Sequence, residues 1–141
     1  MTDSNSNDWV DYRKELIQNK SKSDDDFEKY ITFIASGGLG LTLSFVGNIV
    51  PLSEAISIWA ILLGWFLLAF TLFVNLVSHY LSGSFSYKTI QDIDDVKSFD
   101  IIMENIDNRN KIISCLNLIS IILLGLGILM ILIFVSLNLS L

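Results

Sequence analysis

The stretch ITFIASGGLGLTLSFVGNIV, residues 31–50, contains no Asp, Glu, Lys or Arg and decides the class of fold. Two further uncharged apolar blocks follow, at residues 56–81 and 112–137. A helix rises about 1.5 Å per residue, so about 20 apolar residues cross roughly 30 Å of hydrocarbon. Each block reaches that length. The sequence therefore predicts an all-α, polytopic membrane protein with three transmembrane helices.

The basic residues are distributed unevenly around these blocks. Of the nine Lys and Arg residues, five precede the first block and four lie between the second and third: Arg13, Lys14, Lys20, Lys22 and Lys29, then Lys88, Lys97, Arg109 and Lys111. Basic residues near the ends of spans mark the cytoplasmic side. We therefore expect a bacterial inner-membrane protein with a cytoplasmic N-terminus and a periplasmic C-terminus.

These boundaries divide the chain into five expected segments: 1–23, a cytoplasmic N-terminal segment with a short amphipathic helix; 24–50, the first transmembrane helix; 54–82, the second; 83–111, a cytoplasmic amphipathic helical loop; and 112–137, the third. Serine is a preferred N-cap residue. Ser23 is therefore expected to cap the first membrane helix, and Ser53 the second, with Glu54 in its first turn.

The loop at 83–111 has the periodicity of an amphipathic helix. Its apolar residues recur every three or four positions: Ile90, Ile93, Val96, Phe99, Met103 and Ile106. This spacing predicts a helical hairpin extending from the second and third spans, with a turn near 94–98 and Ser98 capping the return helix. Each apolar stripe then packs on the other arm or on a neighbouring subunit. The core of one such hairpin is thin, which favours a homo-oligomer.

The first span carries an ordered row of small and polar residues. Ser36, Gly40, Ser44 and Asn48 are spaced four residues apart, and Gly37 and Gly47 flank them. Small residues at this spacing let helices approach closely in a bilayer. Two interpretations follow: the row packs on another helix of the same chain, or it lines an oligomeric pore.

Polar residues also share one depth in the other two spans. They are Thr71, Asn75, Ser78 and His79 in the second span and Ser114 and Asn117 in the third. Polar groups within hydrocarbon face partners or water. One interpretation is a hydrogen-bonded seam between the two spans. The other is a water-filled vestibule with His79, the single histidine, at its cytoplasmic rim.

Several chemistries have no support in the sequence. No apolar block contains an Asp, Glu, Lys or Arg residue, which argues against proton-coupled transport and an intramembrane aspartyl protease. There is no nucleophile–base pair, phosphate-binding loop or metal-ligand spacing. The run Asp24–Asp26 suits the first turn of a helix better than a metal site. We therefore expect no catalysis, no cofactor and no metal.

The chain resembles the small membrane effectors of bacterial anti-phage systems, which also have a few spans and little soluble mass. The most distinctive part of the resemblance is the stretch DDFEKYITFIASGGLGLTLSFVGNIVPL, residues 25–52. The nearest likeness is to the channel-forming effectors of the Hailong system. The resemblance implies a partner nucleotidyltransferase whose short DNA oligomers hold the channel closed. It also implies a cationic cytoplasmic site, for which the foremost candidates are Arg13, Lys14, Lys88, Lys97, Arg109 and Lys111.

These observations lead to one expected function and two alternatives. We expect a homo-oligomeric gated pore that permeabilises the inner membrane in abortive infection, controlled by a cytoplasmic signal. The first alternative is a non-conducting membrane anchor or scaffold for a cytoplasmic partner. The second is a phage holin, although three-span holins usually place the N-terminus outside and carry a charged tail.

Overall fold

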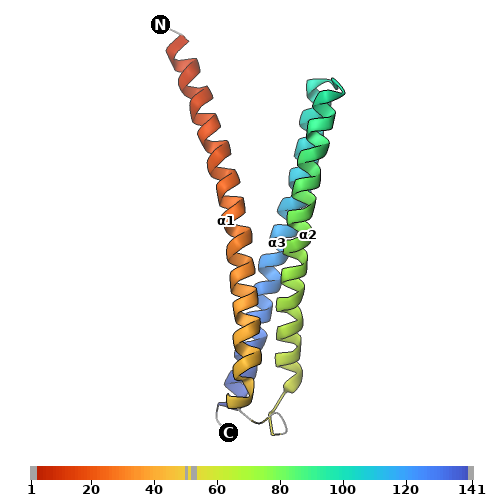
Figure 1. Ribbon diagram of the computed structural model, residues 1–141. Coiled ribbons are helices and arrows are strands. Elements are labelled where there is room, and N and C mark those ends of the chain that lie inside the picture. The colour runs from red at the N-terminus through yellow and green to blue at the C-terminus, as the bar shows by residue number, and fades with distance from the viewer. Residues whose placement is uncertain (1–2, 50, 52–53, 140–141) are drawn as a thin grey trace. The chain divides into compact units, whose positions relative to one another are not determined.

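The computed structural model describes residues 3–49, 51 and 54–139. Three helices follow one another: α1, Asp3–Ile49; α2, Ile58–Asp94; and α3, Phe99–Asn138 (Figure 1). Each contains a stretch that is long and apolar enough to cross a membrane. The predicted all-α fold with three membrane-length helices is confirmed, and it is compatible with a membrane location.

The first helix begins much earlier than the sequence suggests. α1 passes through Ser23 without a break, so the expected helix start there is wrong. The N-terminal part of the chain, residues 1–30, is a compact unit of its own. Within it, Lys20 Nζ lies 3.5 Å from Asp24 Oδ2, one turn away. Such pairs stabilise a helix, so the acidic run continues α1, and the expected short N-terminal helix is part of α1.

The remainder of the chain, residues 31–141, is a second unit in which α2 and α3 pack side by side (Figure 1). Steps of three and four residues separate the members of each inner face. These are Ile61, Gly64, Leu68, Thr71, Asn75, Ser78, Ser82, Phe85, Thr89 and Asp92 on α2, and Asn105, Arg109, Ile113, Asn117, Ser120, Leu124, Gly127, Ile131, Phe134 and Asn138 on α3. The average step is about 3.4 residues on α2 and about 3.7 on α3, close to the 3.6 residues per turn of an α-helix, so one face of each helix stays in contact along its length.

Two glycines set the closest approach of α2 and α3. A Cβ atom on Gly64 would lie 2.8 Å from Ile131 Cγ1 and 3.1 Å from the Gly127 carbonyl oxygen. A Cβ atom on Gly127 would lie 3.0 Å from a methyl carbon of Leu68. Neither position has room for a side chain, because the two backbones occupy that space. The sequence-based interpretation missed this glycine crossing.

The turn between α2 and α3 lies at residues 95–98, where the sequence places it. The Val96 N–H donates to the Ile93 carbonyl oxygen at 3.0 Å, and the Lys97 N–H donates to the Asp92 carbonyl oxygen at 3.2 Å. Val96 has a φ of 54°, in the left-handed region. This is a Schellman ending, which glycine usually occupies. Ser98 is the N-cap residue of α3, but its side chain makes no capping hydrogen bond.

The start of α2 differs from the expected one. α2 begins at Ile58 and not at 54, and Glu54 lies in a turn that precedes the helix. Ser53 lies outside the described residues. The end of α3 braces the segment before α2: the Asn138 amide accepts the Ile56 N–H at 2.8 Å and donates to the Ile56 carbonyl oxygen at 3.0 Å. Both backbone groups of Ile56 are thereby satisfied by one buried side chain, so the chain enters α2 one turn later.

Candidate functional site

The membrane-length part of α1 has two opposite faces. One face packs inward through Ile31, Ala35 and Val46, which are buried. Gly38 lies on the same face, where a Cβ atom would sit 3.5 Å from Leu68 Cδ1. Since residues follow one another at about 100° around a helix, the row that begins at Ser36 is on the opposite side.

Polar contacts reinforce the inward face of α1. The Trp65 indole N–H donates to Thr42 Oγ1 at 2.9 Å, and the Asn75 amide donates to Thr32 Oγ1 at 2.8 Å. Both bonds join α1 to α2 and fix which side of α1 faces the other helices.

We call the outward row the α1 stripe; it comprises Ser36, Gly37, Gly40, Ser44, Gly47 and Asn48. Gly37 is half-buried and the other five are exposed. A Cβ atom on any of the three glycines would meet nothing within 4 Å. Ser36 and Ser44 donate to carbonyl oxygens of their own helix, at 2.6 and 2.8 Å. Packing of the α1 stripe within one chain is therefore not what the structure shows.

The predicted polar seam is present in part between α2 and α3. Ser78 Oγ donates to Asn117 Oδ1 at 3.0 Å. Thr71 is fully buried and donates to the Leu67 carbonyl oxygen of its own helix at 2.8 Å. Asn75 is also buried but turns to α1. The seam therefore joins three helices and not two.

His79 and Ser114 are exposed residues of α2 and α3. The polar residues that the sequence places at one depth thus differ in burial, since Thr71, Asn75 and Ser78 are buried. The structure does not gather them around a vestibule within the single chain.

The distal hairpin, residues 83–111, contains a charged cluster that the sequence did not predict. Asp92, only 5% exposed, accepts hydrogen bonds from Lys97 Nζ at 2.5 Å, from Arg109 Nη2 at 2.6 Å and from the Asn105 amide at 3.2 Å. Arg109 Nη1 also donates to Thr89 Oγ1 at 2.6 Å. We call these five residues the Asp92 network. Thr89 and Asp92 continue, at steps of three and four residues, the polar row that runs through Thr71, Asn75 and Ser78 of α2. This repeat is the sequence signal from which the Asp92 network could have been predicted.

The Asp92 network has a clear electrostatic consequence. The hydrogen bond from Lys97, followed by that from Arg109, holds the pKa of the Asp92 carboxyl below its ordinary value of 3.8. Both cations favour the charged carboxylate, and they outweigh the opposing effect of desolvation. The distal hairpin is therefore held by an ion cluster that stays charged at neutral pH.

The six foremost basic candidates differ in their surroundings. Lys97 and Arg109 meet at Asp92, whereas Lys88 and Lys111 are exposed. Arg13 and Lys14 are exposed in the N-terminal unit. Within the described residues, no group of three His, Cys, Asp or Glu side chains could hold a metal ion.

Three apolar residues near the tip of the distal hairpin lie on its outside, whereas Met103 and Ile106 are half-buried. Ile93, Val96 and Phe99 are 58%, 87% and 74% exposed. The expectation that they pack on the opposite arm of the same hairpin is wrong, because the Asp92 network occupies that contact. Packing on a neighbouring subunit is the alternative that stays open.

Comparison of the chain with family models, with curated proteins and with solved structures gave no match. The functional argument therefore depends on the geometry of the three helices.

Proposed function

We propose that the chain forms a homo-oligomeric, gated pore in the bacterial inner membrane, with α1 at the wall of the conduit. The observation that carries this proposal is the exposure of the α1 stripe on the side opposite to the inward face of α1. Glycines, serines and an asparagine on one face of a membrane helix suit close contact with another helix, or with water, better than contact with lipid. Copies arranged around an axis would supply both.

The extent of the α1 stripe supports this role. From Ser36 to Asn48 is 12 residues, or about 18 Å at about 1.5 Å per residue, which covers more than half of a bilayer's hydrocarbon. The glycines leave room for close approach, since a Cβ atom there would meet no atom of the same chain within 4 Å. A conduit with neutral polar groups suits water and small ions.

The proposed topology follows the basic residues. The N-terminus and the distal hairpin lie in the cytoplasm, and the C-terminus lies in the periplasm, since Lys and Arg mark the cytoplasmic side. The distal hairpin then extends from the pore-forming helices into the cytoplasm, where a signal can act on it. The proposed biological role is membrane permeabilisation in anti-phage abortive infection, with a nucleotidyltransferase and its nucleic-acid product as the proposed signalling partners.

The experiment that tests the pore is ion flux from liposomes containing the purified full chain. Asn48→Leu and Ser44→Leu are expected to lower the flux at equal protein incorporation, because they replace polar groups of the conduit by apolar ones. Phe45→Leu is the matched control, since Phe45 is an exposed residue of α1 outside the stripe. Flux that is unchanged in both stripe variants would remove α1 from the wall.

One observation favours a second candidate, a non-conducting membrane anchor. The exposed apolar surface of the distal hairpin, around Val96 and Phe99, is the kind of surface that binds another protein. In this role the three spans would hold the hairpin at the membrane. Absence of flux from the wild-type liposomes under every ionic condition would favour the anchor over the pore.

A further inference from the structure

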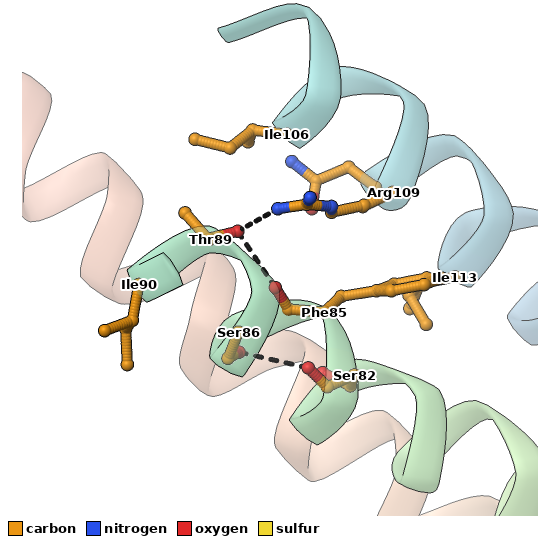
Figure 2. Close-up of a pocket in the computed structure, with 9 residues that line it drawn as sticks. Ser82, Phe85, Ser86, Thr89, Ile90, Ile106, Arg109 and Ile113 are labelled. Atoms are coloured by element: carbon orange, nitrogen blue, oxygen red, sulfur yellow. Dashed lines mark hydrogen bonds between the residues drawn. The ribbon is translucent and has the colours of Figure 1, made fainter. Parts of the chain in front are cut away.

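A groove of about 370 Å³ runs between α2 and α3 beside the Asp92 network. Figure 2 shows its two walls, with Arg109 reaching across from α3 to Thr89 of α2. The lining residues are Ser82, Phe85, Ser86, Thr89, Ile90, Ile106, Arg109, Asn110 and Ile113. Polar donors thus alternate with large apolar side chains, so the groove suits a molecule that is itself amphiphilic.

Arg109 gives the groove a positioned cation. Its guanidinium has five N–H groups, and two hydrogen bonds, to Thr89 and Asp92, fix the plane of the group. The Arg109 side chain is 16% exposed, so its remaining donors are only partly hydrated. Asp92 does not cancel this charge, because the carboxylate also bonds Lys97 and one negative charge is shared by two cations.

The groove lies at the headgroup layer of a bilayer and just beyond it. Arg109 precedes the apolar block at 112–137 by three residues, or about 4.5 Å along α3, and Thr89 follows the block at 56–81 by eight residues, or about 12 Å along α2. The headgroup layer extends about 5–7 Å beyond the hydrocarbon. Lys88 adjoins Thr89, the partner of Arg109, and Lys111 is two residues away, so three cations share this level. Most acids of the distal hairpin lie farther from the apolar blocks.

We infer that this groove binds the phosphate of an anionic phospholipid, with Arg109 at the phosphate and an acyl chain along Phe85 and Ile113 towards the bilayer. A guanidinium is well suited to phosphate oxygens: Arg109 retains N–H groups beyond those that bond Thr89 and Asp92, and the amide of Asn110 supplies further donors. A free phosphate could make the same polar contacts but would make no contact with the apolar side chains of the groove. The lipid site requires a membrane location and does not require conduction, so the lipid site and the proposed pore can fail separately.

The test is native mass spectrometry of the full chain in an uncharged maltoside detergent, titrated with dioctanoyl phosphatidylglycerol. The matched arms are dioctanoyl phosphatidylcholine, which has the same tails and no net charge, and inorganic phosphate. Phosphatidylglycerol is expected to bind about tenfold more tightly than phosphatidylcholine, because its net negative charge is attracted to the Arg109 guanidinium and is not cancelled by a choline. Equal binding of the two lipids would overturn the inference. Displacement of the lipid by an equal concentration of inorganic phosphate would assign the site to free phosphate instead.

Two variants locate the lipid in the groove. Arg109→Gln removes the cation and is expected to weaken phosphatidylglycerol binding about tenfold. Ser86→Phe fills the groove, leaves the bonds of Asp92 in place and is expected to weaken binding similarly, so the result does not depend on the ion cluster. Lys111→Gln, the control, removes an equal charge outside the groove and is expected to change binding about threefold or less. Equal losses for Arg109→Gln and Lys111→Gln, or no loss for Ser86→Phe, would overturn the site.

Discussion

The two ends of the α2–α3 pair are held together by different forces. Near residues 64 and 127 the helices touch backbone to backbone, with Leu68 and Ile131 closing the contact. Near Asp92 the contact consists of a carboxylate, two cations and an amide, and the apolar side chains point outward. The same repeat of three and four residues runs through both ends. The repeat therefore sets which residues meet, and residue type alone decides what force joins them.

The two ends of the α2–α3 pair also suit different surroundings. The glycine end buries its contacts and leaves apolar side chains on the outside, as suits lipid. The distal hairpin has a similar distribution, with polar groups inside and Val96 and Phe99 outside. Its Lys88 and Lys111 exclude it from the hydrocarbon. An apolar exterior in a charged segment is the arrangement expected of a surface that a partner covers.

The largest effect is expected at the glycine end. Gly64→Ala places a Cβ atom 2.8 Å from Ile131 Cγ1 and 3.1 Å from a backbone oxygen. This overpacking should lower the free energy of unfolding by about 1–3 kcal/mol, measured by detergent-induced unfolding. Gly40→Ala is the control, since its Cβ atom would meet nothing within 4 Å, and it should stabilise α1 by up to about 1 kcal/mol. Equal losses in the two variants would mean that the crossing is not close-packed.

The next effect is expected at Asn138, on the same end of the helix pair. Asn138→Ala removes the hydrogen bonds to both backbone groups of Ile56 and the bond to the Phe134 carbonyl oxygen. The loss should be about 1–3 kcal/mol, because buried backbone groups lose their partner. Hydrogen exchange at the Ile56 N–H is the direct measurement. Ser136→Ala, an exposed position in the same turn, should leave that exchange unchanged.

A gain of stability is expected at the turn of the distal hairpin. Val96 is β-branched, is 87% exposed and has a φ of 54°. Val96→Gly should relieve the strain and stabilise the hairpin by about 1 kcal/mol, because almost no packing is lost. Ile101→Gly, an exposed position within α3, should instead cost about 1 kcal/mol. Thermal unfolding of the two variants should show shifts of opposite sign.

The smallest effect at neutral pH, and the one that most clearly separates the two ends, is the response to acid. The pKa of Asp92 is lower in the folded hairpin than its ordinary value of 3.8. Its stabilising contribution is therefore complete above about pH 4 and is lost as the pH falls through the folded pKa. The protection of the Lys97 N–H against hydrogen exchange, relative to the intrinsic rate of an unprotected amide at the same pH, should fall in acid, whereas the protection near Gly64 should not.

The matched variant isolates the cause of this acid response. Asp92→Asn should remove the acid dependence at the Lys97 N–H, and Asp94→Asn, an exposed acid on the same helix, should retain it. Acid dependence that persists in Asp92→Asn would assign the titration to another carboxyl.

The number of helices follows from the sequence because long uncharged blocks have few alternatives. The extent of the helices does not follow, since α1 runs through Ser23 and its acids, which are compatible with both a helix start and a helix interior. The Ser78–Asn117 contact was predictable from depth alone.

The partners of the small residues could not be predicted in the same way. Gly40 and Gly64 are both glycines within a membrane-length helix, yet Gly40 is exposed and Gly64 lies at the crossing of α2 and α3. Spacing shows that small residues share a face and leaves open what that face touches. The Asp92 network was missed for a different reason, because an apolar stripe was expected between the arms of the hairpin. The continued repeat from Thr71 through Thr89 to Asp92 would have indicated the inner face.

The bond between Trp65 and Thr42 provides the molecule with a fluorescent reporter. The chain has three tryptophans, and replacing Trp9 and Trp59 by phenylalanine leaves the one indole that bonds α1 to α2. Departure of α1 from α2 would break this bond and move the indole to a different environment, which shifts its emission. A movement of α1 away from α2 is therefore measurable in real time, with no added dye, on the helix that carries the α1 stripe.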